Sequence, residues 1–272
     1  MQFVELLRAS QSPDLAEMAL QVSRIEYPDL EIAPYLQQLD DIAEQAQRLA
    51  GASASVLDLI DAINQHLFAE LGFKGNDEDY YDPRNSFLNE VIDRRTGIPI
   101  TLGIVYLSVA RRLAVAVNVV SFPGHFLLRV ELTAQPLILD PFNAGRILVN
   151  DDLVKMLDAA GAAGSKVSLE QSLAATANTD VISRVLRNLK GIYVQREDAV
   201  KTLPIVEHLL ALHPNSPSEL RDRGYLFQAL ECFGAARADF ERYLELSPYA
   251  KDGEQIRARC RMLTNDSAKQ LH

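Results

Sequence analysis

Apolar residues in the first 113 positions recur at the three- and four-residue spacing of amphipathic helices. The clearest run is Leu15, Met18, Ala19, Val22 and Ile25. This spacing predicts helices over 15–25, 36–46 and 56–67, then a loop rich in Gly, Asp and Asn over 72–85, and further helices over 86–94 and 100–113. Pro99 suits the first turn of the last helix, because a helix needs no N–H donor there.

The pattern changes after Ala116, where β-branched and aromatic residues replace the helical spacing. Short apolar runs predict antiparallel strands over 117–122, 125–132, 137–140 and 146–149. The polar run Asn150–Asp152 is expected to cap a helix that ends near residue 160, and a Gly- and Ala-rich linker should follow. The fold class predicted for this part is α+β, a helical subdomain with a small antiparallel sheet.

From about residue 178 the pattern is entirely helical and repeats every 34 residues. The run LLALHP ends at Pro214 and the run YLELSP at Pro248. Thirty-four residues is the period of the tetratricopeptide helix–turn–helix unit, and the second copy carries the small and aromatic residues of that repeat. The first copy departs from it, because Lys190 stands where the second has Gly224. We therefore expect a first domain over 1–165, and about two repeats with a capping helix over 178–272.

Composition excludes several function classes. The net charge of −10 is concentrated in residues 1–179, which carry −11, so a nucleic-acid surface is not expected. Cys232 and Cys260 form neither a disulfide framework nor a zinc motif, and no P-loop or GxGxxG run occurs. The longest apolar stretch, 98–110, is too short to cross a membrane. We expect a cytoplasmic protein without a cofactor or a metal.

Three runs resemble the core of the transglutaminase-like superfamily: GIPITLGIVYLSVARRL (97–113), FPGHFLLRV (122–130) and LILDPF (137–142). With RIEYPDL (24–30), GFKGN and LDPFNAG, the chain is similar to bacterial SirB-type proteins, which join this domain to tetratricopeptide repeats and regulate invasion genes. The resemblance implies a cysteine-protease-type core with a nucleophilic Cys at a helix N-terminus, a His at the start of a strand and an Asp at the end of a neighbouring strand.

The residues at these positions depart from those of an enzyme of that type. The nucleophile position falls near 99–101, where there is no Cys, while His125 and Asp140 match the other two positions. Thr101 is either a first-turn residue of its helix or the hydroxyl nucleophile of a Thr101–His125–Asp140 triad. A hairpin turning at Ala134-Gln135 would place His125 and Asp140 on one face, offset by four residues or about 13 Å, so spacing alone does not bring them together.

Two further residue sets are candidates for binding. Asn89, Arg94 and Arg95 fall within the resembling motif and are expected to brace the cleft. In the repeats, the first helix of each pair lines the groove, and the groove residues are predicted to be Arg184, Arg187, Arg221, Tyr225 and Gln228. Arginine captures carboxylates in a bidentate manner, so the groove is predicted to bind an acidic or C-terminal peptide. Alternatively, these arginines are solvated or paired with acids of the protein's own N-terminal domain.

The sequence therefore favours a non-catalytic protein-binding or scaffold protein with a degenerate transglutaminase-like core. The alternative is a hydrolase or acyl transferase that uses Thr101, His125 and Asp140. A third interpretation, a regulator of gene expression, would require indirect action through a partner, because no DNA-binding motif occurs. The partner is expected to be a protein or peptide. Nothing in the sequence indicates an oligomeric state.

Overall fold

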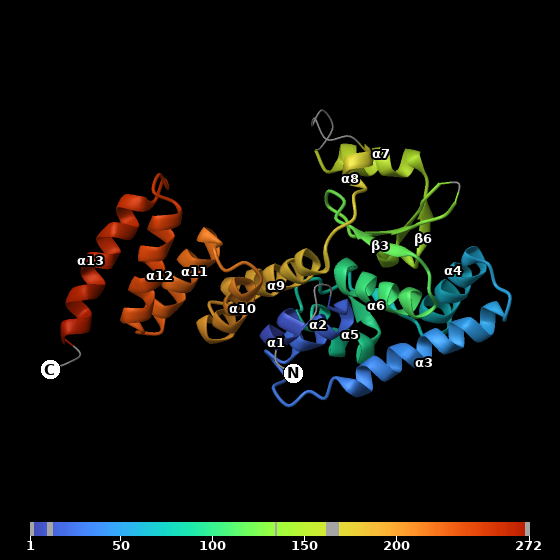
Figure 1. Ribbon diagram of the computed structural model, residues 1–272, viewed down its shortest axis with the longest axis horizontal. Coiled ribbons are helices and arrows are strands. Elements are labelled where there is room, and N and C mark those ends of the chain that lie inside the picture. Colours follow the sequence, from blue (N-terminus) through green and yellow to red (C-terminus); the bar gives the residue numbers. More distant parts are fainter. Residues whose placement is uncertain (1–2, 10–12, 134, 162–168, 270–272) are drawn as a thin grey trace. The chain divides into compact units, whose positions relative to one another are not determined.

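The structure is a computed structural model that describes residues 3–9, 13–133, 135–161 and 169–269 (Figure 1). The chain divides into two units, Met1–Val185 and Leu186–His272. Most of the predicted linker after residue 160 lies outside the described residues. No helix in the described part of the chain is long and apolar enough to cross a membrane.

The first unit is built around helix α6 (Pro99–Arg112), in which every residue from Ile100 to Ala110 is buried. A helix that is apolar on all sides must be covered on all sides. The helices that pack against it are α2 (Leu15–Ser23), α3 (Ala33–Ala50), α4 (Val56–Asn64) and α5 (Leu88–Arg94), and a short helix, α1 (Phe3–Ala9), contacts α2. The helical subdomain predicted from the spacing is confirmed.

A four-stranded antiparallel sheet covers another side of α6. Its strands are β3 (Val117–Val120), β4 (Leu127–Val130), β5 (Leu137–Asp140) and β6 (Arg146–Leu148), paired in sequence order. Strands β3 and β4 pack on α6. In Figure 1, α7 (Asn150–Ala159) and α8 (Leu169–Ser172) lie over the other face, and apolar residues of both helices pack with those of the sheet. Each strand falls within the range predicted for it.

Two features of the first unit were not predicted. Helix α4 continues into a π-helical segment, η1 (Gln65–Glu70), and two-residue strands β1 (Lys74–Gly75) and β2 (Thr96–Gly97) pair in parallel. A two-residue strand is too short to show a periodic pattern. The pairing joins the polar loop after η1 to the residues that lead into α6.

The second unit is entirely helical. Helix α9 (Asn178–Gln195) crosses the boundary between the units, and α10 (Ala199–Leu212), α11 (Pro217–Ala229), α12 (Phe233–Leu246) and α13 (Gly253–Lys269) follow. Successive helices from α10 to α13 pack against each other around a core that includes Val206, Phe240 and Ile256. The predicted segment of helical repeats is confirmed.

Candidate functional site

Thr101 lies at the third position of α6 and is fully buried. Its hydroxyl donates to the carbonyl oxygen of Asn85 at 2.7 Å and accepts from the backbone N–H of Ile98 at 3.1 Å. The second bond satisfies an N–H just before the first turn of α6, a position at which helices leave backbone donors without intrahelical partners. The hydroxyl thus fastens the polar loop to the start of α6.

Asp140 ends strand β5 and is buried. Its carboxylate accepts from the backbone N–H groups of Phe142 at 3.0 Å and Asn143 at 3.3 Å, and from the Asn143 side-chain amide at 2.7 Å. It therefore caps the short 3-10 helix Pro141–Asn143. The ring of Phe142 packs so closely on Gly75 that a Cβ there would lie 2.3 Å from it.

His125 lies just before β4, and the expected hairpin offset is wrong. Leu128 pairs with Leu139, so Asp140 stands opposite Leu127, two residues from His125 rather than four. The two strands pair in a different register from the one that a turn at Ala134-Gln135 would give, so the offset is smaller. Ala134 itself lies outside the described residues. Within the described residues, no hydrogen bond joins His125 to Asp140 or to Thr101.

Arg184 contacts His125 instead. This arginine was predicted in the repeat groove, yet it belongs to the first unit, where its Nη1 donates to the carbonyl oxygen of His125 at 3.3 Å. Its guanidinium also lies over the ring of Phe126, 5.8 Å from the centroid. The Phe126 ring in turn packs on α6, where a Cβ on Gly103 would lie 2.2 Å from it. Helix α9 thus brings a cation to the residues just before β4.

The predicted cleft-bracing residues are divided between two places. Arg94 lies 3.6 Å from the carboxylate of Asp82, and one of its buried nitrogens has no partner among the described residues. Asn89 is buried, and its side-chain oxygen likewise has no partner there. Arg95 adopts a left-handed backbone conformation (φ 54°) and donates to the carbonyl oxygen of Leu71 at 2.9 Å.

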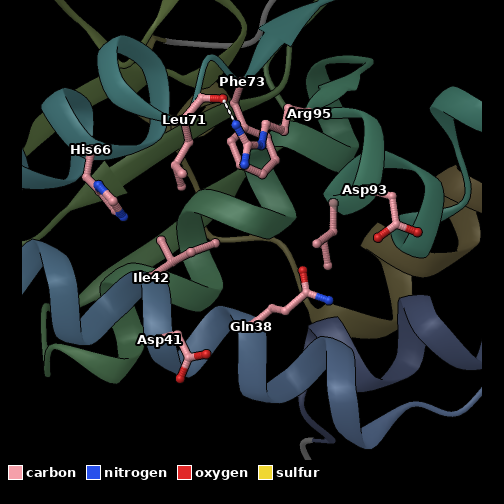
Figure 2. A pocket seen from close by; sticks show the side chains of 9 residues that line it. Gln38, Asp41, Ile42, His66, Leu71, Phe73, Asp93 and Arg95 are labelled. Atoms are coloured by element: carbon pink, nitrogen blue, oxygen red, sulfur yellow. Dashed lines mark hydrogen bonds between the residues drawn. The ribbon is translucent and has the colours of Figure 1, made fainter.

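Arg95 borders a hollow of about 350 Å³ between α3 and the residues that follow η1 (Figure 2). Asp41 and Gln38 line it from α3, and His66 lines it from η1. The Nδ1 atom of His66 lies 2.7 Å from the carboxylate of Glu70, and this hydrogen bond lowers the pKa of Glu70. Neither Asp41 nor His66 was identified from the sequence, because residues on three separate segments meet here only after folding.

The other predicted groove residues are already paired within the repeats. Arg221 donates to Asp252 at 3.0 Å, and Arg187 lies 3.9 Å from Glu219. Lys190 bridges Glu219 and Asp222 at 2.6 and 2.5 Å. The acids therefore come from the second unit itself, not from the N-terminal domain as the alternative supposed.

Tyr225 and Gln228 share one partner, Arg259 of α13. The guanidinium of Arg259 lies 4.9 Å from the centre of the Tyr225 ring and donates to the side-chain oxygen of Gln228 at 2.9 Å. The other side of Tyr225 packs edge-on against Phe240. The capping helix thus covers part of the surface that was predicted to bind a peptide.

The matches to known proteins agree with these two units. A family model described as "Transglutaminase-like superfamily" matches residues 33–187, which is more than half of the chain, and one for the tetratricopeptide repeat matches 189–261. The chain belongs to the transglutaminase-like superfamily. Within the described ranges, no group of three His, Cys, Asp or Glu side chains is placed to hold a metal ion.

Two bacterial relatives of this transglutaminase-like protein align with most of its length. A UPF0162 protein of Xylella fastidiosa is 35% identical over 93% of this chain and 90% of its own length. Protein SirB1 of Salmonella typhimurium is 27% identical over 89% of this chain and 88% of its own. The mouse F-box only protein 21 is 44% identical over 100 residues, which are 35% of this chain and 16% of that protein. The resemblance to SirB-type proteins is confirmed.

Proposed function

We propose that this protein is a non-catalytic, cytoplasmic scaffold that binds another protein through its helical repeats. The observation that carries the proposal is the state of Thr101, the residue at the nucleophile position. Its hydroxyl is buried and bonded to two backbone groups. The transglutaminase-like domain is then a degenerate core that supports binding.

A hydroxyl attacks a carbonyl only when a base takes its proton during the attack. The hydroxyl of Thr101 donates to backbone carbonyl oxygens, which are not bases, and among the described residues no hydrogen bond joins it to the imidazole of His125. Freeing the hydroxyl would break a buried hydrogen bond, at a cost of about 1–3 kcal/mol. The structure therefore favours the scaffold over the hydrolase or acyl transferase with a Thr101–His125–Asp140 triad.

The repeats supply the binding part of the proposal. Tetratricopeptide arrays present a concave surface along which a partner segment docks. An acidic or C-terminal peptide is the proposed ligand, but it would compete with Asp252 for Arg221 and with Glu219 for Arg187. We therefore assign most of the affinity to the apolar part of the surface around Tyr225. Any effect on gene expression would be indirect, through the partner.

A labelling experiment tests the absence of catalysis. The full-length protein is treated with serine-directed and thiol-directed acylating probes, and modified peptides are located by mass spectrometry. We expect no adduct on Thr101; thiol probes should label the exposed Cys232. A stoichiometric adduct on Thr101 that disappears in His125→Ala would refute the proposal and support the acyl transferase.

A capture experiment tests the binding part. Tagged wild-type protein and the variant Tyr225→Ala are used to capture proteins from a bacterial lysate, and proteins enriched by the wild type are purified for direct binding measurements. We expect binding to weaken in Tyr225→Ala and in Arg187→Glu/Arg221→Glu. The matched control is Arg257→Glu on α13, which makes the same change of charge at an arginine that lies 3.6 Å from Glu254. Equal binding by all variants would place the partner elsewhere.

A further inference from the structure

Arg184 differs from the ion-paired arginines of the first unit because, in the part of the chain that the structure describes, no ion pair joins it to a carboxylate. Arg112 pairs with Asp40, Arg129 with Glu131 and Arg146 with Asp152. The guanidinium of Arg184 is half-buried, and its single hydrogen bond goes to the carbonyl oxygen of His125. Burial lowers the pKa of Arg184, because it removes water from the charged guanidinium.

This arrangement is unusual on physical grounds. A charge taken out of water is normally compensated by an opposite charge, since leaving it unpaired is costly. Acids are not scarce, because residues 1–179 carry a net charge of −11. The stretches of this unit that lie outside the described residues contain no Asp or Glu in the sequence. Among the described residues the guanidinium thus has no counter-charge, which suggests that a ligand provides it.

The guanidinium contacts the backbone of His125, and two polar side chains belong to the same part of the first unit. His125 is partly exposed, its ring leans against Phe122 at a centroid distance of 6.5 Å, and its imidazole makes no hydrogen bond within the described residues. Tyr80 is 44% exposed, and a negative charge on its phenol oxygen would raise the pKa of Arg184. Both side chains can donate a hydrogen bond to an anion.

The position of the Tyr80 backbone is set by the residues that hold Thr101. The side-chain amide of Asn85, which is fully buried, donates to the carbonyl oxygen of Asp79 at 2.7 Å, and the Asn85 backbone accepts the Thr101 hydroxyl. On the other side, the Phe126 ring fixed on Gly103 supports the guanidinium. Donors from three segments are therefore held in place before any ligand arrives, which reduces the entropy lost on binding.

We propose that Arg184, His125 and Tyr80 form a binding site for a carboxylate. The guanidinium supplies a planar pair of N–H donors that matches the two oxygens of a carboxylate better than those of a phosphate. The carboxylate belongs either to the C-terminus of a peptide or to a small organic acid. This site is in the first unit and does not depend on the groove or on the absence of catalysis.

The test follows the imidazole of His125 by NMR in full-length protein labelled at histidine. The signal is assigned with His125→Gln, and the other four histidines serve as internal references. The probes are sodium acetate, N-acetyl-trialanine with a free C-terminus, the same peptide with a C-terminal amide, and inorganic phosphate. The variants are Arg184→Met, which keeps an apolar side chain over Phe126, and Arg184→Lys, which keeps the charge without the planar fork. Arg187→Met on the same helix is the matched control.

We expect a saturable shift of the His125 signal with acetate or with the free-acid peptide, and acetate alone would identify small organic acids as the source. Affinity should fall by about tenfold or more in Arg184→Met and for the amide peptide, because a charge-assisted hydrogen bond is lost. Arg184→Lys should bind at intermediate strength, and Arg187→Met should match the wild type. The proposal is overturned by the absence of any shift, by an equal response in Arg184→Met, or by tighter binding of phosphate than of either carboxylate.

Discussion

The ring of Phe240 on α12 lies directly against Gly224 on α11, so closely that a Cβ on Gly224 would be 2.5 Å from the ring. One repeat earlier, the matching positions hold Lys190 and Val206. The second copy thus combines the large Phe240 ring with a glycine, and the first copy combines the smaller Val206 with the long side chain of Lys190. Lys190 extends to Glu219 and Asp222. Lys190 departs from the repeat pattern, but the smaller Val206 on the partner helix compensates for its size. The ammonium group of Lys190 forms ion pairs with two acids of α11.

The first prediction concerns this contact. Gly224→Ala should lower the free energy of unfolding by about 1–3 kcal/mol, because the added methyl group forces the Phe240 ring out of its position. Gly191→Ala is the matched control in the same unit: nothing lies within 4 Å of its Cβ position. That change should raise stability by about 0.5–1 kcal/mol, since alanine is the better helix former. Guanidinium denaturation followed by circular dichroism measures both, and equal midpoints for the two variants would contradict the prediction.

The second prediction tests the structural role of Thr101. Thr101→Val keeps the shape but leaves the carbonyl oxygen of Asn85 and the N–H of Ile98 without their partner. We expect a loss of about 1–3 kcal/mol for these buried polar groups. Thr101→Ser retains the hydroxyl and should lose less. Chemical denaturation of the wild type and the two variants measures the free energy of unfolding. A Val variant as stable as the wild type would show that the two hydrogen bonds do not stabilise the fold.

The third prediction concerns Asp140. Asp140→Ala removes the acceptor for two backbone N–H groups and should cost about 0.5–2 kcal/mol, as for other capping residues. Asp140→Asn keeps one acceptor oxygen and should cost less than Asp140→Ala. Thermal melts of both variants provide the comparison. If Asp140→Asn were the more damaging change, the negative charge itself, rather than the cap, would be the stabilising feature.

The fourth prediction concerns acid stability. Burial acts to raise the pKa of Asp82, but hydrogen bonds from Arg84 and the charges of Arg84 and Arg94 outweigh it, so the pKa lies below its usual value of 3.8. A carboxyl with a lowered pKa stabilises the fold above about pH 4 and loses that contribution as the pH falls further. Between pH 6 and pH 3 the wild type should therefore lose more stability than Asp82→Asn. Parallel losses in urea titrations at the two pH values would exclude this role for Asp82.

Periodic patterns predicted the elements well wherever an element was long enough to repeat its pattern. The strands around β4 and the repeats from α10 onward follow from alternation and from the 34-residue period. The pairing β1–β2 and the π-helical segment η1 leave no such trace. Arg184 was placed in the groove by its offset from Arg187, but packing of α9 against Phe126 determines its actual neighbours. The hollow bordered by His66 and Arg95 depends on contacts between distant segments, which no local pattern encodes.

The ion pairs that α11 makes with α9 and with the turn before α13 also bear on how fast a partner can arrive. Arg221 and Lys190 are neutralised by Asp252, Glu219 and Asp222, and residues 180–272 carry a net charge of only +1. Such a surface projects little electric field into the solvent, so it cannot guide a charged partner during diffusion. Association should then proceed at an unsteered rate of about 10⁵–10⁶ M⁻¹s⁻¹. Discrimination between partners would rest on how long each complex lasts rather than on how quickly it forms.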